Sequence, residues 1–402
     1  MLNNTPIINC YKDLINLNKS RLSTLSSSKN TFYIDGISYS RNIIKFSNSS
    51  MQIDRFLKDY ISNPTFVLTG KVDRLRDYDF TRVNYLLYPE VQKDFTRKLR
   101  EHLNNLALLG ETECRVWDFI VGLDESGIVL KGCTKNKIEE VIIPNFITKI
   151  DGGAFNSNEI SNSKFTKLRT VIFQSGIKLR VLEGITFNCC PIETINLPAG
   201  LEEIGDFAFY CCTDLEEINL PDGLKRIGAC AFYKCNFISV VIPSSVKVIK
   251  ERAFEYCSKL RQVTFKNNSR LKVLENNTFD GCIALEKINL PSSLEEIGTS
   301  TFSFCRSLEK INIPDSVKIL GESAFGWCKS LKEVKIGKGV KDILPYTFRL
   351  CNSLVKVTAL GNIDTISKDV FDGEAMPVIY IPKESKFNLS SEDAYNVKII
   401  KY

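Results

Sequence analysis

The segments LEEINLPDGLKRIGACAFYKC (215–235), LEKINLPSSLEEIGTSTFSFC (285–305) and LEKINIPDSVKILGESAFGWC (308–328) are three copies of one unit. Each unit begins Leu-x-x-Ile-x, continues through a proline, and ends in a phenylalanine followed three residues later by cysteine. The phenylalanine marks the unit along the chain, at Phe155, Phe187, Phe209, Phe232, Phe254, Phe279, Phe302, Phe325, Phe348 and Phe371. After a first step of 32 residues the separations are 22, 23, 22, 25, 23, 23, 23 and 23. A period this regular predicts a repeat architecture.

The spacing within one unit predicts how a single coil folds. Leu-x-x-Ile-x-Leu ends in alternating apolar residues, which is typical of a short strand with one face buried. The next residue is proline, which lacks the N–H that a ladder needs and ends the strand. A second apolar pair, such as Leu224 and Ile227, then returns to the interior on the opposite wall. Glycines such as Gly205 and Gly228 are expected to supply a turn before the phenylalanine.

One coil cannot bury its own apolar face, whereas stacked coils can, with their strands pairing in parallel about 4.8 Å apart. The sequence therefore predicts an α+β protein. Its main part is a solenoid of about ten coils of 22–25 residues, preceded by a small α+β N-terminal domain.

Eight cysteines follow the marker phenylalanines by three residues, at Cys190, Cys212, Cys235, Cys257, Cys282, Cys305, Cys328 and Cys351. A metal ladder or a stack of disulfides is one interpretation. Zinc sites, however, use paired C-x-x-C knuckles, and side chains stacked in parallel point the same way. The favoured interpretation is a column of small buried residues whose S–H groups donate weakly to turn carbonyls.

The pattern Leu-x-x-Ile-x-Leu-Pro, then Ile-x-x-x-Ala-Phe-x-x-Cys, closely resembles the BspA-like (treponemal-type) leucine-rich repeats over residues 137–382. The resemblance implies a leucine-rich-repeat solenoid and a role as an adhesin or host-protein binder. The chain departs from the family pattern in two ways, of which the first, a missing secretory signal, weakens the implied surface location. The first twenty residues lack a signal-peptide core, and Asn158 replaces a ladder cysteine beside an insertion at residues 156–167.

Residues outside the repeat suggest further domains. Residues 1–110 are predicted to be a small α+β domain, with helices at 5–17, 53–61 and from Pro89, and a hairpin at Asp35–Gly36. The last helix has Val91, Phe95, Leu99, Leu103 and Leu106 on one face, and Gly110 is its expected C-cap. Residues 111–136, with a turn at 124–127, are predicted to cap the solenoid that spans 137–382, and residues 383–402 are predicted to cap its other end.

Charge and hydropathy bear on location and partners. The net charge is +6, and its excess lies in residues 1–110, which hold 16 Lys and Arg against 10 Asp and Glu. No stretch reaches the roughly 18 apolar residues needed to cross a bilayer. Without a signal sequence, the expected location is the cytosol with reduced thiols, and the alternative is the cell surface by a non-standard route.

Residue patterns that support catalysis or cofactor binding are missing from the sequence. The single histidine, His102, is expected on the polar side of a helix, so a Cys–His nucleophile could be built only around it. No Walker loop, G-x-G-x-x-G turn or H-E-x-x-H pair occurs. The sequence therefore predicts neither an enzyme nor a metal, cofactor or small-molecule substrate.

The strand positions that point away from the core form the predicted binding surface, because a solenoid presents them as one long sheet. They carry a row that changes from acidic, at Glu216 and Glu217, to basic, at Lys332, Lys335 and Lys356. Such a graded face suits an oriented protein ligand. The predicted protein-binding residues are Thr194, Asn196, Glu217, Asn219, Gln262, Thr264, Lys287, Asn289, Lys310, Asn312, Glu333, Lys335 and Lys356.

A second row follows the phenylalanines, at Tyr210, Tyr233, Tyr256, Phe304 and Trp327, and is interpreted as covering the turns rather than binding. The leading functional hypothesis is a non-catalytic protein-binding scaffold. The first alternative is a surface or secreted adhesin. A weaker alternative is nucleic-acid binding by the basic N-terminal domain, against which aspartates such as Asp73, Asp77 and Asp79 interrupt the basic residues.

Overall fold

The protein is seen in a computed structural model that describes residues 31–34, 37–40, 45–46, 67–68, 89–108, 113–116, 119–134, 137–156, 165–174, 176–367, 369–371, 377–386 and 398–402. It divides into two compact units. The first comprises residues 1–134 with 146–148, and the second comprises 135–145 with 149–402. The helices expected at 5–17 and 53–61, the turn at Asp35–Gly36, Asn158 and Gly110 lie outside the described residues.

The first unit contains hairpins and one long helix. Strands β1 (Thr31–Ile34) and β2 (Ile37–Ser40) pair antiparallel with Ile34 opposite Ile37, which confirms the hairpin. Two short strands, β3 (Lys45–Phe46) and β4 (Val67–Leu68), pair in parallel. Helix α4 (Pro89–Leu108) buries Leu99 and Leu103 as its periodicity predicted. A three-stranded meander follows, made of β5 (Glu113–Val116), β6 (Phe119–Asp124) and β7 (Gly127–Cys133).

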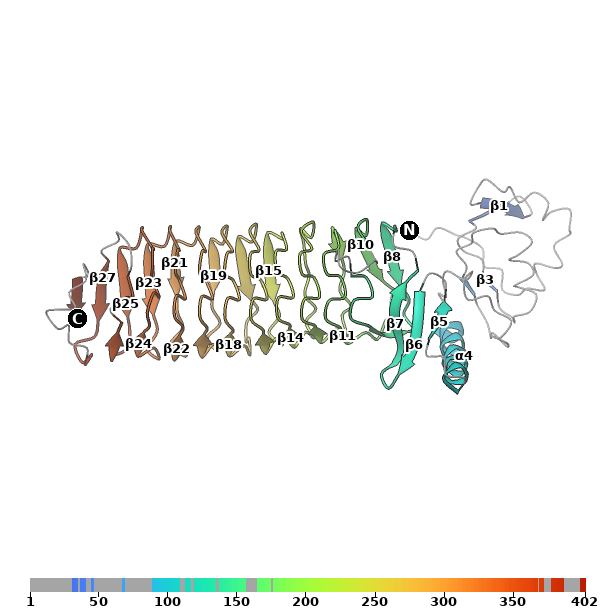
Figure 1. Cartoon of the computed structure of the whole chain (residues 1–402), viewed down its shortest axis with the longest axis horizontal. Coiled ribbons are helices and arrows are strands. Elements are labelled where there is room, and N and C mark those ends of the chain that lie inside the picture. Colours follow the sequence, from blue (N-terminus) through green and yellow to red (C-terminus); the bar gives the residue numbers. More distant parts are fainter. Residues whose placement is uncertain are drawn as a thin grey trace. The chain divides into compact units, whose positions relative to one another are not determined.

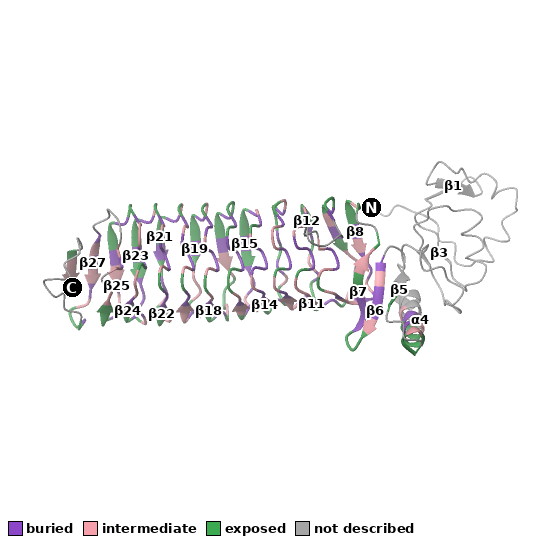
Figure 2. Ribbon diagram, viewed as in Figure 1, coloured by how far each residue is buried: buried purple, intermediate pink, exposed green. Residues whose placement is uncertain are grey.

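The second unit is a solenoid whose coils stack in a single row (Figure 1), as the repeat predicted. Each coil has three sides, and all three contribute buried apolar residues to the interior. Buried residues recur from coil to coil along the solenoid (Figure 2). The Leu-x-x-Ile segment gives the first side, the second apolar pair gives the second side, and the phenylalanine segment gives a turn-rich third side. The fold is therefore decided by stacking, because each coil covers the core of the next.

The first side, here called the strand face, carries parallel strands with alternating exposed and buried residues, as in β15 and β23. Its strands are β8 (Glu140–Ile143), β10 (Thr170–Phe173), β12 (Thr194–Ile195), β15 (Ser239–Ile242), β17 (Gln262–Phe265), β19 (Lys287–Asn289), β21 (Lys310–Asn312), β23 (Glu333–Ile336), β25 (Lys356–Ala359), β27 (Val378–Ile381) and β28 (Lys398–Lys401). Strand β28 pairs in parallel with β27, so the C-terminal residues extend this side.

The second wall consists mostly of two-residue strands that pair in parallel from coil to coil. They are β9 (Ile147–Ile150), β11 (Val181–Leu182), β13 (Glu203–Ile204), β14 (Arg226–Ile227), β16 (Val248–Ile249), β18 (Val273–Leu274), β20 (Glu296–Ile297), β22 (Ile319–Leu320), β24 (Asp342–Ile343) and β26 (Thr365–Ile366). The last apolar residue of each pair points inward; Ile227 and Ile249, for example, are fully buried.

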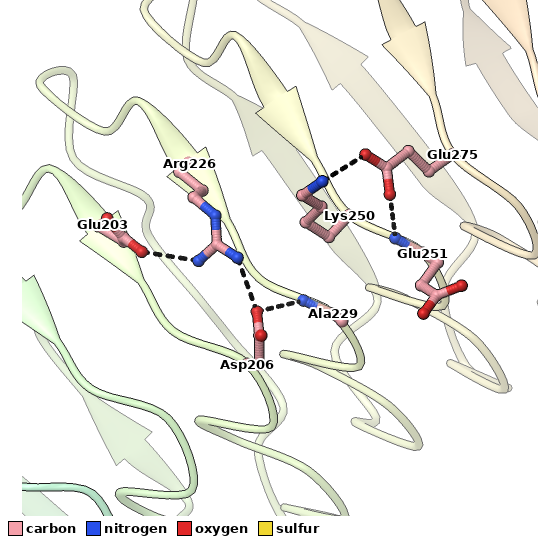
Figure 3. A network of polar contacts seen from close by, with 7 residues as sticks. All are labelled: Glu203, Asp206, Arg226, Ala229, Lys250, Glu251 and Glu275. Carbon is pink, nitrogen blue, oxygen red and sulfur yellow. Dashed lines mark hydrogen bonds and ion pairs between the residues drawn. The ribbon is translucent and has the colours of Figure 1, made fainter.

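Charged side chains join neighbouring coils beside this wall (Figure 3). The Arg226 guanidinium lies 2.6 Å from Glu203 and 2.9 Å from Asp206, and Asp206 also accepts the backbone N–H of Ala229. One coil further on, Glu275 accepts hydrogen bonds from Lys250 and from the N–H of Glu251. These contacts satisfy amides at the point where each coil enters its turn. Their role is therefore structural.

The third side, here called the turn wall, is built on the marker phenylalanines. Nine consecutive pairs of rings stack with centroids 5.3–5.9 Å apart, from Phe155 to Phe371. Each of the eight ladder thiols donates to the carbonyl of the preceding coil's phenylalanine, at 2.8–3.3 Å. This confirms the prediction of small buried residues bonded to turn carbonyls.

The repeat glycines begin a turn before the Ala-Phe pair, as predicted, since the N–H groups of Ala208 and Ala231 donate to the carbonyls of Gly205 and Gly228. Gly205 and Gly228 do not adopt positive φ; instead, a Cβ at either position would lie 2.5 Å from the backbone of the preceding coil. The left-handed positions are two residues before and two after each phenylalanine, and they are mostly not glycine. Phe207 and Cys211, on either side of Phe209, have φ of 60° and 57°. The glycines therefore permit close approach, and ordinary residues carry the strained turns.

Candidate protein-binding face

The structure places the predicted binding residues on one side of the solenoid. Of the thirteen, twelve are exposed, and Thr264 is half-buried. They alternate with buried residues such as Ile195, Ile288 and Val334, so the predicted register of the strands was correct. The side chains on this face are mainly amide, hydroxyl and charged groups. The face can therefore form hydrogen bonds and ion pairs with a polar protein surface.

The strand face is not the single long sheet that the sequence predicted. It is divided into three parallel sheets, β8–β10–β12, β15–β17–β19 and β21–β23–β25–β27–β28. Residues 215–220, which carry Glu217 and Asn219, form no strand. A second break separates β19 from β21. The repeat pattern gave no sign of either break, because the apolar positions of these coils are as regular as the others.

A shallow groove lies at each break. The first is lined by Thr194, Asn196, Glu217 and Asn219 among others, and the second by Lys287, Asn289, Lys310 and Asn312. Eight of the thirteen predicted residues therefore line one groove or the other. Concave polar surfaces of this kind hold a partner's side chains better than a flat sheet does. These grooves are the most site-like features of the strand face.

Ion pairs between coils change the predicted charge gradient. Lys310 and Glu333 are direct partners in the β21–β23 ladder, and their charges lie 3.1 Å apart. Lys332 pairs with Glu309 at 3.0 Å, and Glu216 lies 3.7 Å from Lys259. Glu216, Lys310, Lys332 and Glu333 are thus neutralised within the chain, which weakens the predicted charge gradient without removing it.

The charges that remain available to a partner are fewer than the sequence suggested. Within the described part of the chain, Glu217, Lys287 and Lys335 have no ion pair and are exposed. Lys356 lies over the ring of Tyr380, 5.1 Å from its centroid. An acidic residue thus still stands near one end of the face and a basic residue near the other, each free to contact a ligand.

The aromatic row on the turn wall is packed upon itself. Tyr210 and Tyr233 stack at 4.6 Å, and Phe304 and Trp327 stack at 5.2 Å. These four side chains are half-buried, whereas Tyr256 is 44 % exposed. The stacking fits the interpretation that this row covers the turns.

Next to this row lies an acidic pair that the repeat pattern did not predict. Glu255 is buried and lies 3.3 Å from Arg252, and burial raises its pKa. Burial, together with repulsion from Glu255, raises the pKa of Asp280 to about 7. One carboxylate oxygen of Asp280 is buried without a hydrogen-bond partner among the described residues.

The remaining candidates for catalysis or metal binding among the described residues are His102 and the ladder thiols. His102 lies half-buried on α4. No group of three or more His, Cys, Asp or Glu residues suited to a metal ion occurs in the portion of the chain that the structure describes. Within that same portion, no helix is both long and apolar enough to cross a membrane. The ladder thiols are buried and hydrogen-bonded, and burial raises the pKa of the seven from Cys190 to Cys328, which makes these seven poor nucleophiles.

Several solved leucine-rich-repeat structures are similar to this chain. A protein from Bacteroides ovatus is 22 % identical, with a TM-score of 0.44, covering 72 % of this chain and all of its own. The pneumococcal vaccine antigen PcpA is 17 % identical, with a TM-score of 0.40, over 72 % of this chain and 98 % of its own. A leucine-rich cell surface protein from Faecalibacterium prausnitzii is 20 % identical, with a TM-score of 0.41, over 72 % and 94 % respectively.

Sequence comparison identifies the repeat directly. No curated protein matches the chain. The model of the BspA type leucine rich repeat region matches six copies, over residues 129–179, 181–274 and 272–395. These residues make up more than half of the chain and contain every ladder cysteine and marker phenylalanine. The chain belongs to the BspA-type leucine-rich-repeat family.

Proposed function

We propose that this protein is a non-catalytic scaffold that binds another protein through the strand face of its solenoid. The observation that carries the proposal is the pair of grooves at the breaks in the sheet, which eight of the predicted binding residues line. The family supports the same role, because its members are generally non-catalytic repeat scaffolds.

The grooves offer a partner two kinds of contact. Amide side chains such as Asn219 and Asn289 can both donate and accept hydrogen bonds. Lys287 in the second groove, and Lys335 outside the grooves on the same face, add positive charge that no carboxylate of the described chain neutralises. A partner with carboxylates at matching positions would be oriented along the solenoid, since charge complementarity sets register and association rate.

The test uses the full chain with the charges of Lys287 and Lys335 reversed to glutamate. Proximity labelling in the native cell would compare this double variant with the unmodified protein. We expect labelling of the main partner to fall about tenfold, which corresponds to about 1.4 kcal/mol of binding free energy.

The matched control reverses Lys178 and Lys247, two exposed lysines that precede strands β11 and β16 of the second wall. This control has the same net charge as the test variant but leaves the strand face unchanged. If both double variants label the same partners equally, the strand face is not the binding surface.

Family membership favours a second candidate, a surface or secreted adhesin. No comparison supports the cytosolic location that the sequence predicted. The description as a cell surface protein belongs to the Faecalibacterium protein. Protease treatment of intact cells separates the candidates. Loss of the full-length chain from intact cells supports the adhesin, and its survival until the cells are lysed supports an internal scaffold.

A further inference from the structure

Two cysteines outside the ladder occupy the same position in adjacent coils. Cys189 lies two residues after Phe187, and Cys211 lies two residues after Phe209. The next coils carry Lys234 and Tyr256 at this position. Cys189 and Cys211 are half-buried, whereas their ladder neighbours Cys190 and Cys212 are fully buried.

The backbone holds the two residues in matched conformations. Their φ angles are both 57°, and the preceding phenylalanine rings stack at 5.5 Å. The N–H of Cys189 donates to the carbonyl of Tyr210 at 2.7 Å, and that of Cys211 donates to Tyr233 at 2.8 Å. The two coils therefore have the same local backbone conformation and are separated by one stacking step of about 4.8 Å. This step falls within the Cα separation of about 4.4–6.8 Å that disulfides require.

The thiols of these two residues have different partners from the ladder thiols. The ladder thiols of Cys190 and Cys212 donate to phenylalanine carbonyls at 2.8 and 3.1 Å. The Cys189 and Cys211 thiols instead lie close enough to one another that each affects the pKa of the other. The two sulfur atoms therefore already lie near one another in the reduced protein.

We propose that Cys189 and Cys211 are an oxidative modification site, at which a low-molecular-weight disulfide such as oxidised glutathione converts the two thiols into a reversible disulfide between adjacent coils.

The reaction balances as two thiol–disulfide exchanges. The Cys211 thiolate attacks one sulfur of the reagent, forming a mixed disulfide and releasing one glutathione thiolate, which takes up the proton lost by Cys211. The Cys189 thiolate then attacks the Cys211 sulfur, forming the bond between coils and releasing the second glutathione, which takes up the proton lost by Cys189. The two cysteines are oxidised, and the reagent is reduced to two thiols.

Two features bear on the reactivity of this site. Burial raises the pKa of Cys211, while the Lys234 ammonium in the following coil acts in the opposite direction. The partial exposure of both sulfur atoms gives the reagent access that the buried ladder denies. The bond would also join the two coils that carry Thr194 and Glu217, so it would fix their spacing at the first groove.

The experiment equilibrates the full chain with graded ratios of reduced and oxidised glutathione, blocks free thiols by alkylation, and cleaves after glutamate. Oxidation is expected to remove two alkylated thiols and to join peptides 184–193 and 204–216, and dithiothreitol should reverse both changes. The variants Cys189→Ser and Cys211→Ser should each abolish the joined peptides and leave glutathione on the remaining cysteine. The control Cys230→Ser, which alters a buried cysteine of the next coil, should retain them.

Three results would overturn the proposal, two of them in the unmodified chain. One is that Cys189 and Cys211 each carry a separate glutathione without joining. The other is that both remain alkylated at every ratio while the chain stays folded by circular dichroism. Cross-linked peptides that persist in both serine variants would assign the bond to Cys190 and Cys212 instead, and would equally exclude the proposed pair.

Discussion

The turn wall and the strand face use the same repeat in opposite ways. On the turn wall nearly every coil repeats the same contacts, a stacked phenylalanine and a thiol bonded to the previous coil. On the strand face the buried residues repeat, but the exposed residues vary and the sheet breaks twice. The difference indicates that the turn wall supplies stability, whereas the strand face is free to vary for recognition.

The strongest test of this comparison is the removal of one stacked ring. Phe232 is fully buried between Phe209 and Phe254, with centroids 5.3 and 5.4 Å away. Phe232→Ala should lower the free energy of unfolding by about 3–5 kcal/mol, through lost apolar contact and the cavity left behind. Denaturant unfolding measures the change, with Phe232→Leu as a milder control. A loss below about 1 kcal/mol would contradict the role assigned to the turn wall.

A smaller effect is expected where coils approach most closely. A Cβ at Gly228 would lie 2.5 Å from backbone atoms of Gly205 and Asp206, so Gly228→Ala should cost about 1–3 kcal/mol through overpacking. Gly223→Ala is the matched control, because its Cβ would lie 3.6 Å from the nearest atom, which is ordinary contact. Thermal unfolding of both variants would show whether close approach, and not turn geometry, explains the repeat glycines.

The acidic pair beside the turn wall predicts a pH dependence. The pKa of Asp280 is raised from 3.8 to about 7 by burial and by Glu255, so the folded state holds a proton that the unfolded state releases. The contribution of Asp280 to the free energy of unfolding is fully present below pH 3.8 and is lost as the pH rises toward 7. Asp280→Asn should therefore stabilise the protein at pH 8, on the order of 1 kcal/mol, and much less at pH 4. An equal shift in the melting temperature at both pH values would exclude this titration.

The left-handed turn positions predict a gain in stability. Ser300 has a φ of 53°, and its N–H donates to the carbonyl of Glu322. Glycine adopts this conformation without the steric cost of a Cβ, so Ser300→Gly should add about 0.5–1 kcal/mol after the loss of backbone entropy. The equivalent Ser323→Gly provides an independent repeat of the measurement. Destabilisation by both variants would show that these turns are not strained.

The smallest stability effects are expected on the strand face. Asn219 is exposed and lies in a segment that forms no strand, so Asn219→Ala should change the free energy of unfolding by less than about 0.5 kcal/mol. Lys310→Ala, which breaks the pair with Glu333, should cost at most about 1 kcal/mol because both groups are exposed. Chemical denaturation checks both values. A cost for Asn219→Ala comparable to that of Phe232→Ala would abolish the contrast between the two sides.

Much of the fold could be predicted from the sequence because it rests on local periodicity. The spacing of Leu224, Ile227 and Phe232 determines which side chains face inward, and stacking then follows from the need to bury them. The bonding of Cys235 to a turn carbonyl was predictable for the same reason, since a buried thiol in a regular coil lies near the carbonyls of the coil before it. The alternation of residues along a strand predicted that Asn289 and Lys335 would be exposed, as they are.

The tertiary structure decided those features of the molecule that depend on the distance between neighbouring coils. The breaks in the strand face are one example. Two others bring together residues more than twenty positions apart: Lys310 pairs with Glu333, and the thiol of Cys189 lies near that of Cys211. Gly205 belongs to the same group, because its role depends on the backbone of another coil. The sequence by itself determined the pattern within a coil, whereas the contacts between coils depend on how closely neighbouring coils approach on each side.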